Sequence, residues 1–244
     1  MQKLASAIFL FFGFACLATA QVTDDELMVR QLLQRYTETY GGLREANRLA
    51  SISIEGVQRQ GGVEYSFHMR KKRPASMRYQ LERGDTSLTT IYNGRQGWLL
   101  TKKAGAVSSE ELSGARLEIL QREARFESPL YRHLEKPENK ITFEGREQVG
   151  LAQAYVLRVE EPGSPPSRYF IEADSAHVLR LDRLNEAGEV VFQTFYRDYR
   201  EVEGYPFAHE VENRIEGETV SITRVESILV NPGLLSFYFE NPGN

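Results

Sequence analysis

The first periodic segment of the chain predicts an amphipathic helix. From Met28 to Tyr40 apolar side chains recur at every fourth residue, which is the spacing of one helix face. Residues Thr23–Glu26 have the form of a capping box at the start of this segment, and Gly41-Gly42 ends it. We expect a helix of about 17 residues that packs its apolar stripe on another surface, followed by a short helix over residues 43–49.

From Ser51 onward the pattern changes, because apolar and polar residues alternate as they do in β-strands. Turn signals such as Asn93-Gly94 and Glu216-Gly217 separate the alternating segments. Closely spaced strands joined by short turns predict an antiparallel meander. Besides the alternation that starts at Ser51, we expect strands over residues 63–70, 77–82, 86–92, 97–101, 141–149, 153–160, 167–173, 177–185, 189–200, 205–215 and 218–230.

One segment interrupts this alternation and predicts a second helical element. In residues 108–125 leucines are spaced among charges, so we expect a helix inserted between strands. About ten or eleven antiparallel strands exceed what a flat open sheet usually carries before it curls. The sequence therefore predicts a mainly β fold with a single, strongly curved antiparallel sheet whose concave face helices can cover. The Pro-Gly-Ser-Pro-Pro stretch at 162–166 predicts a hairpin loop, so residues 21–244 are expected to form one domain.

The N-terminal residues 1–20 have the features of a cleaved signal peptide. Lys3 precedes an apolar run and Ala18-Thr19-Ala20, which fits a cleavage site. The run is shorter than the roughly 20 apolar residues of a membrane span. We expect cleavage after Ala20 and export of the chain to the periplasm. An uncleaved anchor and a lipid-modified Cys16 are the alternatives.

Composition excludes several kinds of chemistry. Cys16 is the only cysteine, so the mature chain can form no disulfide, cysteine-ligated metal site or cysteine nucleophile. The formal net charge is −4, which argues against a nucleic-acid partner. Histidines 68, 133, 177 and 209 are isolated in the sequence, and no Gly-x-Ser-x-Gly or phosphate-binding glycine motif is present. We therefore expect a protein that is not an enzyme and that has no cofactor and no metal site.

Several short motifs occur in an order that resembles a known family. They are Tyr40-Gly41-Gly42-Leu43, Ile52-Ser53-Ile54-Glu55-Gly56, Lys72-Arg73-Pro74 followed by Arg78, Tyr92-Asn93-Gly94, Gly97-Trp98, Tyr199-Arg200-Glu201-Val202 and Gly204-Tyr205-Pro206-Phe207. In this order the chain resembles the LolA-like family of periplasmic lipoprotein carriers of Gram-negative bacteria. The resemblance implies an unclosed β-barrel of about eleven strands, with helices as a lid over an apolar cavity. It also implies an arginine that locks the lid, a role to which the sequence alone assigns no residue.

The resemblance implies a carrier that shelters acyl chains of a lipoprotein or lipid for sorting or transport to the outer membrane. Acyl-chain burial stabilises a complex by about 0.8 kcal/mol per methylene group, so no polar anchor is needed. Its partners would be the lipid or lipidated protein, an inner-membrane donor and an outer-membrane acceptor, with the carrier itself a monomer. The alternatives are a protein-interaction or sensor module of the cell envelope on the same fold, and a hydrolase of a lipid-like substrate.

The residues expected to line the cavity lie on three of the predicted strands. They are Phe67, Met69, Met77, Tyr79, Trp98 and Leu100. The alternation presents the first four on one face, and Trp98 is expected to join them, although a filled core is the alternative for all six.

Four consecutive cations, Arg70, Lys71, Lys72 and Arg73, precede Pro74 between two of these strands. The pattern predicts a solvated hairpin tip, which would tolerate replacement of all four by Ser. The second interpretation is a contact for anionic headgroups or an acidic partner at the mouth of the cavity.

Overall fold

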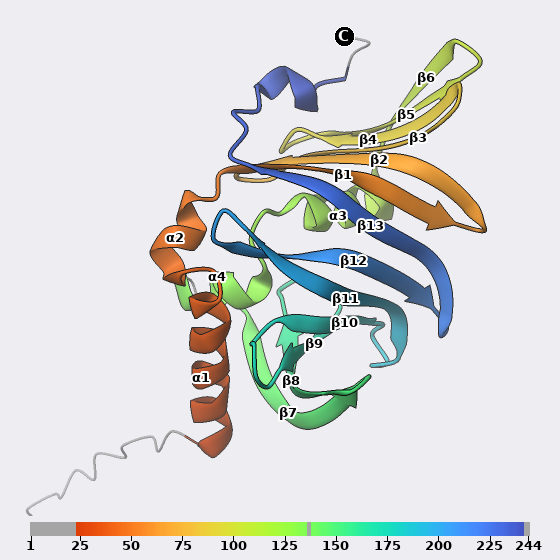
Figure 1. The fold of residues 1–244 in the computed structure, drawn as a ribbon. Coiled ribbons are helices and arrows are strands. Elements are labelled where there is room, and N and C mark those ends of the chain that lie inside the picture. The colour runs from red at the N-terminus through yellow and green to blue at the C-terminus, as the bar shows by residue number, and fades with distance from the viewer. Residues whose placement is uncertain (1–22, 136–137, 242–244) are drawn as a thin grey trace, which may run out of the picture.

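One antiparallel sheet of thirteen strands forms the body of the protein (Figure 1). The computed structural model describes residues 23–135 and 138–241, so the predicted signal peptide lies outside the described residues. The strand order is β6-β5-β4-β3-β2-β1-β13-β12-β11-β10-β9-β8-β7. Two meanders are thus joined where the first strand pairs with the last, and β6 and β7 remain as the edges of an unclosed barrel. The expected fold class is confirmed.

The described residues form four α-helices, one short 3-10 helix and thirteen strands. The helices are α1 (Asp24–Glu38), α2 (Gly42–Arg48), α3 (Gly114–Ala124), α4 (Pro129–Glu135) and the short 3-10 helix η1 (Ser236–Phe239). The strands are β1 (Ser51–Gln60), β2 (Val63–Lys72), β3 (Ser76–Arg83), β4 (Thr86–Tyr92), β5 (Gly97–Lys103), β6 (Ala106–Glu111), β7 (Lys140–Val149), β8 (Ala152–Glu160), β9 (Ser167–Glu172), β10 (Val178–Leu184), β11 (Val190–Val202), β12 (Tyr205–Ile215) and β13 (Glu218–Val230).

The sheet has more strands than expected, and β6 explains part of the difference. The prediction of a helix over residues 108–125 is wrong at its start, because β6 pairs with β5 from Lys103↔Ala106 to Trp98↔Glu111. All six residues of β6 are exposed, so this edge strand carries no apolar alternation that a sequence pattern could reveal. The helix itself begins only at Gly114, and α4 was not expected.

Helix α1 packs on the inner face of the sheet, which we define as the face that α1 and α3 cover. The expected capping box is present, since Thr23 accepts a hydrogen bond from the Glu26 amide and Glu26 bonds back to the Thr23 amide. Leu32 and Leu33 are buried against α4 and the inner face of β8 to β10. The buried members of this core are Val29, Leu32, Leu33, Tyr36, Ala46, Leu130, Tyr131, Leu157, Val159, Tyr169, Ile171, Ala176 and Leu181.

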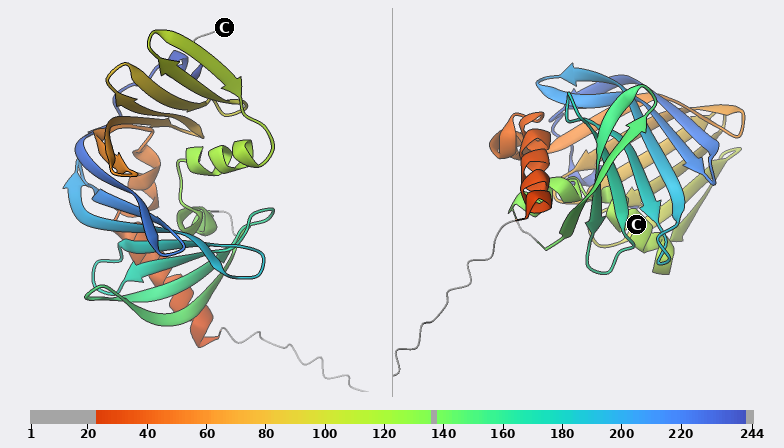
Figure 2. Two further views of the ribbon diagram at one scale, coloured as in Figure 1. Left: turned by 90° about the vertical axis from the view of Figure 1, so that its right-hand side faces the viewer. Right: turned by 90° about the horizontal axis from the view of Figure 1, so that it is seen from below.

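Helix α3 lies between the β3–β6 end and the β7–β10 end of the sheet, on its inner side (Figure 2). Leu120 and Ala124 are its buried residues, and they pack with Met77 and Tyr92 of the sheet. Gly97 permits the close approach, because a Cβ at this position would lie 2.6 Å from Leu120 Cδ2.

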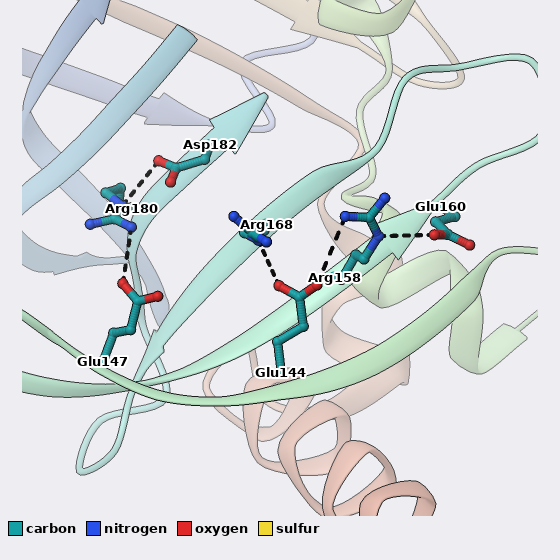
Figure 3. Close-up of polar contacts among 7 residues, drawn as sticks. All are labelled: Glu144, Glu147, Arg158, Glu160, Arg168, Arg180 and Asp182. Atoms are coloured by element: carbon teal, nitrogen blue, oxygen red, sulfur yellow. Dashed lines mark hydrogen bonds and ion pairs between the residues drawn. The ribbon is translucent and has the colours of Figure 1, made fainter. Parts of the chain in front are cut away.

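On the outer face of β7 to β10, ion-paired side chains cover the sheet where no helix does (Figure 3). The Arg180 guanidinium lies 3.5 Å from the ring centroid of Phe170, which is fully buried. Arg180 also pairs with Asp182 at 3.0 Å, and Arg158 lies between Glu144 and Glu160. Guanidinium groups can cover aromatic rings while keeping carboxylate partners, so this face is closed without helices.

The C-terminal segment covers the outer face of the other end of the sheet. Phe239 is 2% exposed and packs with Ile91, Trp98 and Leu100 of β4 and β5. Two residues earlier, Phe237 is 58% exposed. Of the two phenylalanines of η1, Phe239 is therefore the one that is buried on the sheet.

This asymmetry gives a stability prediction. We expect Phe239→Ala to lower the free energy of unfolding by about 3–5 kcal/mol, the usual cost of removing a buried phenylalanine ring. Phe237→Ala, the matched control in the same short helix, removes an exposed ring that stacks on Tyr238 and should change it by no more than about 1 kcal/mol. Urea unfolding followed by circular dichroism measures both. Equal losses in the two variants would contradict the packing of Phe239 described above.

Candidate functional site

A cavity of about 780 Å³ lies between α3 and the inner face of the sheet. Strands of both meanders contribute to its wall, together with α3 and Leu112, two residues before this helix. Most of the lining side chains are apolar. The lining residues are Ile52, Ile54, Gln58, Phe67, Met69, Lys71, Met77, Tyr79, Thr90, Leu99, Leu112, Arg116, Ile119, Leu120, Glu123, Arg183, Phe192, Thr194, Tyr196, Ala208, Val211, Asn213, Thr223 and Val225.

Four of the residues expected to line a cavity do lie in its wall. Phe67 and Met69 come from β2, and Met77 and Tyr79 come from the neighbouring β3. The register pairs Met69 with Tyr79, so the alternation of each strand presents these side chains together on the inner face.

Trp98 and Leu100 lie on the outer face, so the prediction that they line the cavity is wrong. The register of β4 and β5 pairs Ile91 with Trp98, and both side chains pack against Phe239 on the outer face. Leu99 is the residue of β5 that lines the cavity. Because β5 is apolar on both faces, the sequence could not show which of its side chains point inward.

Sequence reasoning missed the half of the wall that comes from α3 and from β10 to β13. Phe192, Tyr196 and Val211 belong to strands that were expected, and their alternation was visible. What the sequence lacks is the pairing of β1 with β13, which brings these strands opposite β2 and β3. Only the order of strands across the sheet identifies the face that they share with Phe67.

Polar side chains in the cavity wall bond to one another. Gln58 Oε1 accepts hydrogen bonds from the Tyr79 hydroxyl and from Thr223 Oγ1, the latter at 3.1 Å. On the neighbouring strands Thr194 Oγ1 donates to Asn213 Oδ1 at 3.0 Å. Burial raises the pKa of Tyr79, so its hydroxyl stays protonated. These groups are neutral and satisfied, which suits them to the wall of an apolar cavity.

The four cations do not form a solvated hairpin tip, although β2 and β3 do form the expected hairpin. The tip lies against α2 and against the connection from α3 to α4. Arg73 donates to the carbonyl oxygens of Leu49 at 2.7 Å and Ala46 at 3.0 Å, and its guanidinium pairs with Glu127 and lies over the Phe126 ring. Arg73 therefore binds the end of α2 and the α3–α4 connection at once.

Lys71 lies on the inner face, two residues before Arg73. Its Nζ donates to the carbonyl oxygens of Glu123 at 2.7 Å and Arg125 at 2.8 Å, where α3 ends. Lys71 also lines the main cavity and a smaller one of about 230 Å³ under α1 and α2. Burial lowers the pKa of Lys71 to about 8, and the Glu123 carboxylate only partly opposes this shift.

Arg70 and Lys72 alternate with these residues and face outward. The Arg70 guanidinium lies 5.4 Å from the ring centroid of Tyr238, and Lys72 Nζ donates to the Leu234 carbonyl oxygen at 2.9 Å. The hairpin thus contacts the helices on one side and the C-terminal segment on the other.

A single ion pair connects α3 to the opposite side of the cavity. Arg183 Nη2 of β10 lies 2.5 Å from Glu123 Oε1 of α3. Tyr196, which lines the same part of the wall, interacts electrostatically with both partners. Burial raises the pKa of its phenol to about 12, so the ring remains neutral.

The described residues offer no constellation for metal chemistry. Residues 23–135 and 138–241 contain no group of three or more histidine, cysteine, aspartate or glutamate side chains that could hold a metal ion. Within the same ranges, no helix has the length and apolar character needed to cross a membrane.

Comparisons with known proteins identify the fold. Compared by sequence, the chain matches no protein-family model and no curated protein. Compared by structure, it is similar to a DUF1329 family protein from Desulfovibrio piger, with a TM-score of 0.62 and 14% identity over 88% of this chain and 98% of the other.

Two further solved structures are similar to the same extent. One is a domain from Vibrio parahaemolyticus named as an outer membrane lipoprotein-sorting protein, with a TM-score of 0.59 and 9% identity over 86% of this chain and 94% of that one. The other is a LolA superfamily protein from Nitrosomonas europaea, with a TM-score of 0.56 and 9% identity over 88% and 99%. The chain therefore has a LolA-like fold, as the order of its motifs suggested.

The contacts of Arg73 predict that it stabilises the helices. We expect Arg73→Met to lower the free energy of unfolding by about 2–4 kcal/mol, because three backbone or carboxylate partners lose their donor. Arg70→Met, the control in the same hairpin, removes one cation–π contact and should cost no more than about 1 kcal/mol. Urea unfolding of both variants tests this difference. If Arg73→Met were as stable as the wild type, the earlier hairpin-tip interpretation would regain support.

The lowered pKa of Lys71 predicts a pH dependence of stability. In the unfolded chain the amine titrates near 10.5 and in the folded protein near 8, so the unfolded state binds more protons between these values. Stability of the wild type relative to Lys71→Met should therefore rise with pH in this window, by at most about 1.4 kcal/mol per pH unit. Below pH 8 the difference between the two proteins should be constant. Urea unfolding of both proteins across the window measures it, and a flat difference throughout would contradict the burial of the ammonium group.

Proposed function

We propose that this chain is a non-catalytic carrier of the periplasm that shelters the acyl chains of a lipid or lipoprotein in the cavity under α3. The observation that carries the proposal is the apolar cavity of about 780 Å³ inside a LolA-like fold. Ligand pockets in proteins have volumes of roughly 300–1,000 Å³, so a long hydrocarbon chain is a suitable occupant. In this proposal the carrier is exported by its signal peptide and acts as a monomer between an inner-membrane donor and an outer-membrane acceptor.

The attachment of α3 supports a cover that can open. Only Leu120 and Ala124 of this helix are buried, and Ile119 on the cavity side is 52% exposed. Leu117 packs partly buried beside them. The polar attachments of α3 to the sheet are those of Lys71 and Arg183 and the exposed ion pair of Arg116 with Glu110 of β6. Polar contacts exchange with water at a small net cost, so α3 can move without disrupting the core of α1 and β8 to β10.

The neighbouring positions 98 and 99 allow a direct test of the cavity. Trp98 is the only tryptophan and lies on the outer face, whereas Leu99 lines the cavity. The double variant Trp98→Phe, Leu99→Trp moves the fluorophore to the inner face. Titration with a fatty acid brominated along its chain should quench this variant with saturation, and the unbrominated acid should reverse the quenching.

Wild-type protein is the matched control, because its tryptophan lies on the far side of the sheet and should retain its emission. Equal quenching of both proteins would place the lipid outside the cavity. If equilibrium dialysis with a radiolabelled fatty acid and with a phospholipid detected no binding to delipidated wild-type protein, the proposed function would be wrong.

A further inference from the structure

The cavity wall carries more cationic than anionic side chains. Three cations, Lys71, Arg116 and Arg183, line the cavity, but Glu123 is the one carboxylate among the lining residues. Arg116 pairs with Glu110, which does not line it, at 2.5 Å. Glu123 is therefore the one lining carboxylate available to both Lys71 and Arg183: it forms an ion pair with Arg183 and interacts with Lys71 only electrostatically.

Glu123 belongs to the helix that covers the cavity, whereas its cationic neighbours belong to the sheet. Its carboxylate bonds to Arg183, and its backbone carbonyl accepts from Lys71. The side chains of Arg183 and Glu123 are 32% and 48% exposed, so their ion pair is in contact with water. Exposed pairs of this kind contribute little to stability, and another anion can replace the carboxylate at small cost.

We propose that the cavity takes an anionic amphiphile, whose acyl chain lies on the apolar wall and whose carboxylate or phosphate headgroup binds Arg183 and Lys71 in place of the Glu123 carboxylate. This inference rests on the proposed function and adds the chemical class of the ligand. A guanidinium binds either headgroup through paired N–H donors, and the lysine adds a second charge. A neutral headgroup that displaced Glu123 would leave Arg183 without an anionic partner.

Binding of such a ligand would also affect α3, the helix that covers the cavity. Glu123 holds α3 to β10 only while its carboxylate occupies Arg183. When a headgroup takes this position, the link between α3 and the opposite side of the cavity is released. Arginines on the outer face, such as Arg158 and Arg180, also have acidic partners, but they do not line the cavity.

Two ligands with the same chain and different headgroup charge test the proposal. Calorimetric titration of delipidated wild-type protein compares dodecanoate with 1-lauroylglycerol, both below their micellar concentrations. We expect dodecanoate to bind about tenfold more tightly, the value of one charge-assisted hydrogen bond. Dodecyl phosphate is the third ligand, and the tighter of the two anions identifies the preferred headgroup.

Substitutions of the two partners of the ion pair should have opposite effects on dodecanoate binding. Arg183→Gln should remove the preference for dodecanoate and leave the affinity for 1-lauroylglycerol unchanged, and Arg183→Lys should keep part of the preference. Glu123→Gln should strengthen dodecanoate binding, because the competing carboxylate is gone. Arg200→Gln is the matched control, since Arg200 pairs with Asp198 on an exposed part of β11 away from the cavity.

A purely structural role of the ion pair gives a different result. Breaking the pair from either side would then shift the affinities for both ligands in the same direction, and that outcome would overturn the inference. Equal binding of dodecanoate and 1-lauroylglycerol to the wild type would also overturn it while leaving the proposed function intact. Failure of all three ligands to bind would overturn the inference, and the dialysis with phospholipid described above would then decide the proposed function. Thermal unfolding of each variant shows whether it is folded. If Arg183→Gln does not fold, the effect of Glu123→Gln on dodecanoate binding still decides the test.

Discussion

The inner face of the curved sheet is larger than the helices that lie over it, and the rest of the structure depends on this mismatch. Neighbouring strands are about 4.8 Å apart, so thirteen of them present a long concave surface. Helix α3 has 11 residues and is only about 16 Å long. Helices α1 and α4 fill the surface over β8 to β10, and the part that faces α3 remains open as the cavity. No single side chain creates this space, because it follows from the number of strands and the lengths of the helices.

Two different kinds of contact hold the helices to the sheet. Helix α1 is held by leucine and tyrosine side chains that are almost fully buried, and removing any of them would leave a void. The end of α2 and the connection between α3 and α4 are held in addition by Arg73 and Lys71, mainly through backbone carbonyl oxygens. Carbonyl oxygens can bond to water when they lose a protein donor, so the second set of contacts is reversible. Helix α3, which covers the cavity, is thus held by exchangeable polar contacts together with only two buried side chains, Leu120 and Ala124.

The sequence predicted those features that depend on neighbours in the chain. Alternation in β2 and β3 placed Phe67, Met69, Met77 and Tyr79 on one face, and the structure confirms that they share it. Alternation failed for Trp98, because apolar residues occupy both faces of β5 and only the register with β4 decides the direction.

The contacts of the four cations at residues 70–73 could not be predicted from the sequence either. A turn between two strands was correctly expected around Pro74, and its charges suggested exposure to solvent. The partners of Arg73 and Lys71 lie up to 54 residues away along the chain, and most of them are backbone carbonyl oxygens, which every residue type carries. No pattern of side chains could identify them. Burial of a charged residue by distant backbone is a property of the assembled fold, and sequence periodicity does not report it.

The two faces of the sheet use arginine for different purposes, although the net charge of the chain gives no sign of this. On the outer face, arginines meet acids of the same sheet: hydrogen bonds from Arg214, Thr219 and Arg197 hold the pKa of Glu212 at about 2. Glu212 therefore stays ionised at any physiological pH. Its partners Arg197 and Arg214 both lie over the ring of Phe195. On the inner face, Arg183 has its acidic partner on a helix and not on the sheet. If α3 separated from β10, Arg183 would therefore remain in the cavity wall as a cation without its acidic partner, which is the group that the proposed anionic headgroup needs.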